Sequence, residues 1–265
     1  MRRLLCFLAL SACTTGTLAL GRLDDATAVP DGGAEAGADA ADCIPGAPVR
    51  HYAFTGTGTD VPDLAGGASA RILGGAALDG SGRLALDGID DYVDLPNGIL
   101  AGLDAVTFES WLRFRGGGGY QRIFDIGTSS LGEDPLATAA YVGRSYVAAT
   151  PSSGLDPSGL AALFSAPATD GEVHASTATF LGQTTFRHVV VVATATSVAL
   201  YLDGVPVAQT THASAPLSTV ADVNAWLGRS NYAADPYLEA DYAAFRVYGR
   251  ALTACAVEAT FRAGP

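Results

Sequence analysis

The 265-residue chain is nearly half hydrophobic and only 16% charged, so it has ample apolar material for a packed core. It carries 27 acidic against 15 basic residues, and every basic residue is an arginine. The resulting net charge of -12 repels phosphate backbones, which argues against a nucleic-acid partner. Length alone leaves one large β domain or two smaller ones open.

The first thirteen residues, MRRLLCFLALSAC, have the pattern of a lipoprotein signal peptide. Arg2 and Arg3 give a positive start, and Leu4 to Leu10 is an apolar segment too short to span a bilayer. The segment that ends at Cys13 resembles a bacterial lipobox, which implies that this cysteine is diacylated and begins the mature chain. The alternative is ordinary signal-peptide cleavage near residues 18 to 21.

Beyond this signal, no segment approaches the ~18 apolar residues that a membrane span requires. The N-terminal lipid would therefore be the only membrane contact of an exported protein, anchored to the bacterial cell envelope. Residues 14 to 42 are rich in Ala, Gly, Asp and Thr and contain no aromatic residue, so we predict a disordered acidic tether. A single folded domain is expected over residues 43 to 265.

Export also determines how the four cysteines are interpreted. Cys6 leaves with the signal and Cys13 is modified, so Cys43 and Cys255 remain as a pair in a compartment that permits disulfides. A bridge between them would place the first and last strands of the domain side by side. Two unrelated free thiols are the alternative.

The rest of the chain reads as many short strands separated by Gly- and Pro-rich turns, which favours an all-β sandwich or barrel. The expected strands are His51 to Phe54, Leu84 to Leu86, Tyr92 to Leu95, Val106 to Phe114, Ile123 to Gly127, Ala140 to Tyr146, Phe186 to Ala193, Ser197 to Leu202, Val205 to Ala208, and a closing strand around Phe245 and Val247. One helix is expected from Leu252 to Arg262, capped by Thr253.

Three of these strands carry more specific signals. The apolar run of Phe186 to Ala193 predicts a central strand buried on both faces. Asp203 and Gly204 predict a tight hairpin turn, and Pro206 in the return strand predicts a sheet edge. Val106 to Phe114 alternates cleanly, and its second face, with Trp111, predicts partial cover by loops or a concave binding surface.

Two stretches carry a family resemblance: LDGIDDYVDLP at residues 86 to 96, and WLGRSNYAADPYLEADYAAFRVYGRAL at residues 226 to 252. Both resemble bacterial laminin-G-like, concanavalin A-like jelly-roll domains. The resemblance implies an all-β jelly-roll sandwich of two antiparallel sheets. Related sandwiches include lectins, adhesion modules and enzymes, so the fold alone does not select a function.

The resemblance also raises the possibility of calcium, which several such sandwiches bind through carboxylate and carbonyl oxygens. Asp63 occupies a position where family members carry an aspartate, and Asp63 and Asp241 are the candidate ligands. Close relatives have paired acidic residues where this chain has Ala243 and Ala244, which weakens the case. We interpret the acidic cluster of residues 87 to 94 as turn residues with local hydrogen bonds.

The sequence does not indicate an enzyme. A glycosidase needs two carboxylates that flank the scissile bond, and none of the expected strands places acidic residues at alternating positions. Glu109 stands alone on its strand, and positioning a nearby segment is its expected role. The histidines are scattered and no HExxH or GxSxG motif occurs, so neither a zinc nor a serine hydrolase is expected. His188 is expected to be satisfied by hydrogen bonds within the sheet.

Carbohydrate binding fits the C-terminal stretch best. Sugars stack their C–H faces on aromatic rings, while their hydroxyls bond to carboxylates and arginine. Trp226, Arg229, Tyr232, Asp235 and Tyr237 supply both kinds of group within twelve residues. For these residues the structural interpretation, in which the tyrosines brace the loop and Arg229 pairs with Asp235, is favoured, because the motif recurs in a family with diverse ligands. We predict a non-enzymatic cell-surface recognition module for polysaccharide, with a protein-binding adhesion module as the alternative.

Overall fold

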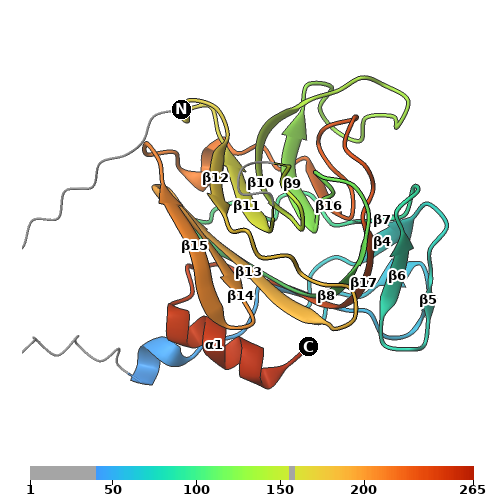
Figure 1. Cartoon of the computed structure of the whole chain (residues 1–265), viewed down its shortest axis with the longest axis horizontal. Helices are drawn as coiled ribbons and strands as arrows, with labels where there is room; N and C mark the ends of the chain where they lie inside the picture. Colours follow the sequence, from blue (N-terminus) through green and yellow to red (C-terminus); the bar gives the residue numbers. More distant parts are fainter. Residues whose placement is uncertain (1–39, 155–158) are drawn as a thin grey trace, which may run out of the picture. The chain divides into compact units, whose positions relative to one another are not determined.

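Two antiparallel β-sheets form the framework of the computed structural model, which describes residues 40–154 and 159–265 (Figure 1). The first sheet has seven strands, in the order β1 (Arg50–Ala53), β17 (Glu239–Tyr248), β8 (Ala105–Gly116), β13 (Arg187–Thr194), β14 (Ser197–Leu202) and β15 (Val205–Thr211), with β6 (Leu84–Asp87) also paired to β17. The expected signal peptide, Cys13 and residues 14–39 of the expected tether lie outside the described residues.

The second sheet has eight strands. Their order is β12 (Val173–Ser176), β11 (Ala161–Ser165), β10 (Gly143–Thr150), β9 (Phe124–Ser129), β16 (Asn224–Leu227), β7 (Tyr92–Asp94), β4 (Ala70–Leu73) and β3 (Asp60–Val61). A small ladder joins β2 (Thr57–Gly58) to β5 (Leu78–Asp79). The prediction of an all-β, antiparallel two-sheet architecture is confirmed.

The core lies between the two sheets, because alternate side chains of each strand point to the same interior. The Phe108 ring of β8 lies 4.7 Å from the Phe124 ring of β9, and 6.1 Å from the Phe245 ring of β17. All three rings are fully buried. They join the sheets at the centre of the sandwich, as the alternation of Val106 to Phe114 predicts.

A helix covers the outer face of the first sheet. Helix α1 (Ala254–Ala263) begins at Thr253, whose side chain accepts a hydrogen bond from the Ala256 amide, as expected. Figure 1 shows it beside β14 and β15. Val190 and Val192 pack in the cluster under α1, whereas Val189 and Val191 face the main core. The valine run is therefore buried on both faces, as predicted.

The same helix adds to the expected partial cover of the second face of β8. The ring of Phe261 in α1 stacks on Trp111 at 5.8 Å, and Trp111 is only 8% exposed. Beside this stack, Trp111 lines a pocket of about 390 Å³ together with the loop residues 81–83 and Phe186. Within the described residues, no helix has the length and apolar character that a bilayer crossing needs.

Glu109 lies at the centre of a buried polar network on this face. Its carboxylate accepts hydrogen bonds from Trp111 Nε1 (3.1 Å), Arg246 Nη1 (2.8 Å) and the Tyr248 hydroxyl (2.9 Å), and His188 Nε2 lies 3.3 Å away. Burial alone would raise the pKa of Glu109, but the hydrogen bond to His188 and the charge of Arg246 hold that pKa below its usual value. The network agrees with the positioning role expected for Glu109.

Cys43 and Cys255 form the expected disulfide, with their Cα atoms 4.8 Å apart. It joins the 3-10 helix η1 (Ala40–Cys43) to α1, and the Thr253 hydroxyl donates to the Asp42 carbonyl oxygen nearby. Residues 40–42, assigned to the tether on composition, thus belong to η1. Strands β1 and β17 pair directly, with Tyr52 opposite Phe245, so the first and last strands are neighbours as predicted.

The β14–β15 hairpin also has the predicted form. Asp203 and Gly204 adopt φ values of 51° and 80°, the left-handed pair that a two-residue turn needs. Strand β15, with Pro206, lies at the end of its sheet. Another expected strand, Ala140 to Tyr146, is displaced along the chain, because β10 begins at Gly143 and continues to Thr150.

Candidate functional site

The five residues predicted to bind a ligand lie on β16 and on the loop of residues 228–238 that follows it. Gly228 begins this loop with φ 84°, and a Cβ there would lie 2.5 Å from Leu86 Cδ1, so only glycine fits. Trp226 is fully buried beneath the loop and cannot touch a ligand. The other four side chains divide between two pockets.

Arg229 lies over Trp226 rather than pairing with Asp235. Its guanidinium carbon is 4.0 Å from the centre of the Trp226 ring and 4.8 Å from that of Tyr92. Its Nη2 donates to the Pro135 carbonyl (2.6 Å) and to the Tyr141 hydroxyl (3.3 Å). The Nε atom is buried without a hydrogen-bond partner, and the residue is 5% exposed.

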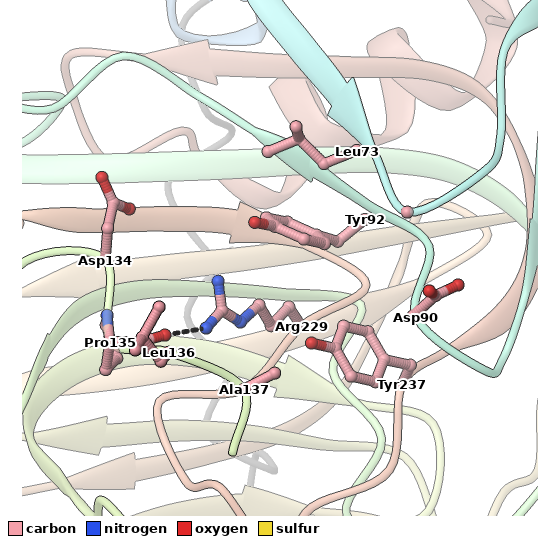
Figure 2. A pocket seen from close by; sticks show the side chains of 10 residues that line it. Leu73, Asp90, Tyr92, Asp134, Pro135, Leu136, Ala137, Arg229 and Tyr237 are labelled. Atoms are coloured by element: carbon pink, nitrogen blue, oxygen red, sulfur yellow. Dashed lines mark hydrogen bonds between the residues drawn. The ribbon is translucent and has the colours of Figure 1, made fainter. Parts of the chain in front are cut away.

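The first pocket, which we call the Tyr237 pocket, has a volume of about 340 Å³ and is shown in Figure 2. It is lined by Leu73, Gly74, Asp90, Tyr92, Asp134, Pro135, Leu136, Ala137, Arg229 and Tyr237. The Tyr92 and Tyr237 rings lie 6.1 Å apart at 45°. Figure 2 shows the Arg229 side chain between these rings and Pro135, with Asp134 and Asp90 on opposite sides.

Burial raises the pKa of both Tyr92 and Tyr237, so each hydroxyl is neutral at physiological pH. A neutral phenol both donates and accepts hydrogen bonds. The Tyr237 pocket therefore combines apolar ring faces, neutral hydroxyls, two carboxylates and one buried cation.

The second pocket, the Tyr232 pocket, has a volume of about 180 Å³ and is lined by Tyr120, Arg122, Glu172, Tyr232 and Asp235. Arg122 Nη2 pairs with Asp235 at 2.9 Å, and its Nη1 donates to the Tyr120 carbonyl at 2.7 Å. The predicted structural pair of Arg229 with Asp235 is therefore wrong, because Asp235 turns toward Arg122. Burial raises the pKa of Asp235, although the charge of Arg122 opposes this.

The loop between the pockets is held in place by hydrogen bonds to three neighbouring segments. The Asn231 amide and side chain both donate to Asp125, each at 2.9 Å. The Ala233 amide donates to the Tyr141 carbonyl at 3.0 Å, and Gln121 Nε2 donates to the Tyr237 carbonyl at 2.6 Å. Both pocket walls are thus fixed before any ligand arrives.

Sequence reasoning identified the loop but missed most of the residues opposite it. Tyr92 and Asp90 lie in the LDGIDDYVDLP stretch, where they were interpreted only as strand and turn residues. Arg122 and Glu172 come from segments that carry no motif. The one local signal is Tyr120, which follows a run of glycines and adopts φ 67°, a strained value for a tyrosine at a pocket wall.

The calcium candidates are both engaged by the protein itself. Asp63 accepts hydrogen bonds from the amides of His51 (2.8 Å), Ala65 (2.9 Å) and Gly67 (3.1 Å). Asp241 accepts from Arg113 Nε at 2.7 Å, with Arg115 Nε 3.6 Å away. These contacts give each carboxylate a structural role, and calcium binding at Asp63 and Asp241 stays a prediction.

The acidic cluster in LDGIDDYVDLP makes the local hydrogen bonds that were expected. Asp91 Oδ1 accepts from the amides of Gly75 and Ala76, both at 2.7 Å, and its Oδ2 accepts from the Asp87 amide at 3.0 Å. Asp87 in turn accepts from the Ile89 amide at 2.8 Å. Although Asp90 lies close to both, these bonds assign Asp87 and Asp91 to shaping the turn.

Replacement of Asp94 by asparagine is expected to change how stability depends on pH. Burial, followed by repulsion from Asp134, raises the pKa of Asp94 to about 6. Its unfolded value is ~3.9, so between these pH values the folded state holds a proton that the unfolded chain has released. The wild type therefore loses stability relative to Asp94→Asn as the pH rises from about 4 to about 6.

Melting temperatures of both proteins, measured by circular dichroism at intervals from pH 4 to pH 8, check this expectation. The advantage of Asp94→Asn should grow up to about pH 6 and then stay constant. Asp79→Asn is the matched control: a hydrogen bond from Ser81 lowers the pKa of Asp79, so its effect should be flat above about pH 5. If the melting temperature of the wild type instead rises relative to that of Asp94→Asn as the pH increases, the raised pKa of Asp94 is contradicted.

The two facing antiparallel sheets, with pockets formed largely by connecting segments, define a β-sandwich. The family model described as the concanavalin A-like lectin/glucanases superfamily matches residues 87–258, about two-thirds of the chain. The chain belongs to this superfamily, which confirms the family resemblance. No curated protein matches the chain.

Solved structures show the same fold. One is domain 4 of AbnA, a GH43 extracellular arabinanase from Geobacillus stearothermophilus, in complex with arabinotriose, with a TM-score of 0.62 and 18% identity over 80% of this chain and 97% of that one. Another is Trypanosoma rangeli sialidase in complex with sialic acid, with a TM-score of 0.56 and 14% identity. That match covers 80% of this chain but only 32% of the sialidase. At these identities the likeness concerns the fold.

Proposed function

We propose that the protein binds polysaccharide at the Tyr237 pocket and releases it unchanged. The observation that carries this proposal is the lining of the pocket, where the Tyr92 and Tyr237 rings lie beside the buried Arg229. Aromatic faces pack against sugar C–H groups, and a buried arginine donates hydrogen bonds to sugar oxygens without needing to be desolvated. Asp90 and Asp134 offer acceptors for sugar hydroxyls.

The arabinotriose complex of AbnA domain 4 supports the ligand class, because that domain has the same fold over nearly its whole length. Arabino-oligosaccharides are therefore the first ligands to test. The Tyr237 pocket is large enough for a small sugar segment, since about 340 Å³ falls within the ~300 to 1,000 Å³ common for ligand sites.

Recognition without hydrolysis is supported by the position of Glu109. It is the carboxylate that the sequence offered for catalysis, yet it is 1% exposed and its oxygens accept hydrogen bonds from Trp111, Arg246 and Tyr248. A general acid has to reach the glycosidic oxygen, which a side chain enclosed beneath α1 cannot do. We further propose, on the N-terminal signal pattern, that this binding activity belongs to an exported protein lipid-anchored at Cys13 to the bacterial cell envelope.

Tyr237→Ala is expected to weaken binding of arabinotriose about tenfold, because it removes one of the two stacking faces. Isothermal titration calorimetry on the purified domain, preceded by a screen of neutral and acidic oligosaccharides, measures this loss. Phe180→Ala is the matched control, since Phe180 is an exposed aromatic residue that does not line either pocket. It should leave affinity unchanged.

A screen in which no oligosaccharide binds contradicts the proposal and favours the protein-binding alternative. Equal losses in Tyr237→Ala and Phe180→Ala would place the sugar elsewhere on the surface. Turnover of the bound oligosaccharide, followed by chromatography of the products, would contradict the non-enzymatic assignment.

A further inference from the structure

The loop of residues 228–238 forms a wall of both pockets. Tyr237 lines the Tyr237 pocket, whereas Tyr232 and Asp235, at most five residues earlier, line the Tyr232 pocket. Tyr141 connects the pockets from behind: its hydroxyl accepts from Arg229 in the first, and its carbonyl accepts from Ala233 beside the second. The same loop and Tyr141 therefore contribute to both pockets.

Each pocket alone is small. The Tyr232 pocket, at about 180 Å³, is below the ~300 Å³ at which ordinary ligand sites begin, and the Tyr237 pocket is only slightly above it. Yet the linings of both pockets include two tyrosine rings, two carboxylates and one buried arginine. Two pockets with similar binding groups on either side of a short loop can hold two successive segments of a ligand that is built from repeating units.

The charge of the two pockets identifies the chemical class of that ligand. The wall carboxylates are Asp90, Asp134, Glu172 and Asp235, and the half-buried Asp94 and the buried Asp125 lie behind them. Arg122 and Arg229 are the cations in the two pocket linings, and Arg122 is already paired with Asp125 and Asp235. The surplus of negative charge repels uronic acids and sialic acid.

We infer that the site takes the interior of a polysaccharide chain without anionic groups, which crosses the 228–238 loop and occupies both pockets. This inference rests on the proposed function and adds to it a length requirement and a charge preference. The chain's hydroxyls bond to the wall carboxylates, and its ring faces pack on Tyr92 and Tyr237 in one pocket and on Tyr120 and Tyr232 in the other. A monosaccharide can occupy only one pocket at a time, so it lacks the contacts that the second pocket would provide.

Calorimetry with arabinotriose and arabinohexaose on the whole domain tests the length requirement. The hexasaccharide should bind at least tenfold more tightly than the trisaccharide. Tyr120→Ala should remove most of this gain, because Tyr120 lines the Tyr232 pocket and is 43% exposed, whereas Phe180→Ala should leave the affinity for both ligands unchanged. Tyr237→Ala should weaken both ligands.

Galacturonic acid oligomers of the same length test the charge preference. Binding of arabinohexaose should not respond to salt between about 0.05 and 0.5 M, since no ion pair forms across the interface. An anionic oligomer that binds more tightly than arabinohexaose overturns the inference, and so does equal affinity for the trisaccharide and hexasaccharide. If no sugar binds at all, it is the proposed function that fails, so the two failures are distinguishable.

Discussion

Replacement of both Cys43 and Cys255 by serine is expected to lower the free energy of unfolding by about 5 kcal/mol. The disulfide joins residues 212 positions apart, and a cross-link over so long a loop removes much of the conformational entropy of the unfolded chain. Urea denaturation followed by tryptophan fluorescence measures the effect. The midpoint should fall, and the slope should rise because the unfolded chain without the bridge exposes more surface.

Wild-type protein in a reducing buffer provides the control for this variant. Once its disulfide is reduced, its unfolding curve should coincide with that of Cys43→Ser/Cys255→Ser, because the two chains then differ only by sulfur and oxygen. An unchanged urea midpoint in the double variant would show that the unfolded chain retains the proximity of these residues without the bridge.

Glu109→Ala is expected to destabilise the domain by about 3 to 5 kcal/mol, the range found when one member of a buried charge network is removed. The substitution leaves Arg246 half-enclosed without its carboxylate partner, and it orphans the Tyr248 hydroxyl and Trp111 Nε1. The outer face of β8 would then present unpaired polar groups to α1. Thermal and urea unfolding at pH 7 measure the loss.

Two variants make this result specific. Glu258→Ala removes a carboxylate from an exposed pair with Arg262, and it should cost no more than about 0.5 kcal/mol. Glu109→Ala/Arg246→Ala should be less destabilised than the sum of its two single variants, because the second change removes the cation that the first left unpaired. Additive losses would show that Glu109 and Arg246 are not coupled.

The elements with the clearest local sequence patterns were predicted correctly. Val106 to Phe114, the valine run of β13 and the Asp203-Gly204 turn each carry a local signal that the fold keeps. Strands β4, β11 and β12 were missed, since segments such as Ala161–Ser165 are built largely from small residues with no clear alternation. Their conformation is determined by pairing with distant strands, which a local pattern does not contain.

The candidate site likewise has features that follow from local sequence and features that depend on distant residues. The loop of residues 228–238 was identified from its composition, but its side chains were treated as one cluster. The separation into two pockets depends on partners remote in sequence: Pro135 and Tyr141 hold Arg229, and Arg122 holds Asp235. Nothing in the spacing of the loop residues distinguishes these partners, so the sequence favoured a pair between Arg229 and Asp235 that the fold does not make.

Pro206 on the outermost strand, β15, has a consequence for how copies of the protein behave when crowded. A proline offers no N–H, so an incoming strand from a neighbouring molecule finds a gap in the hydrogen-bond ladder it would need to extend the sheet. Extension of the first sheet at β15 by a strand of a second copy is therefore disfavoured.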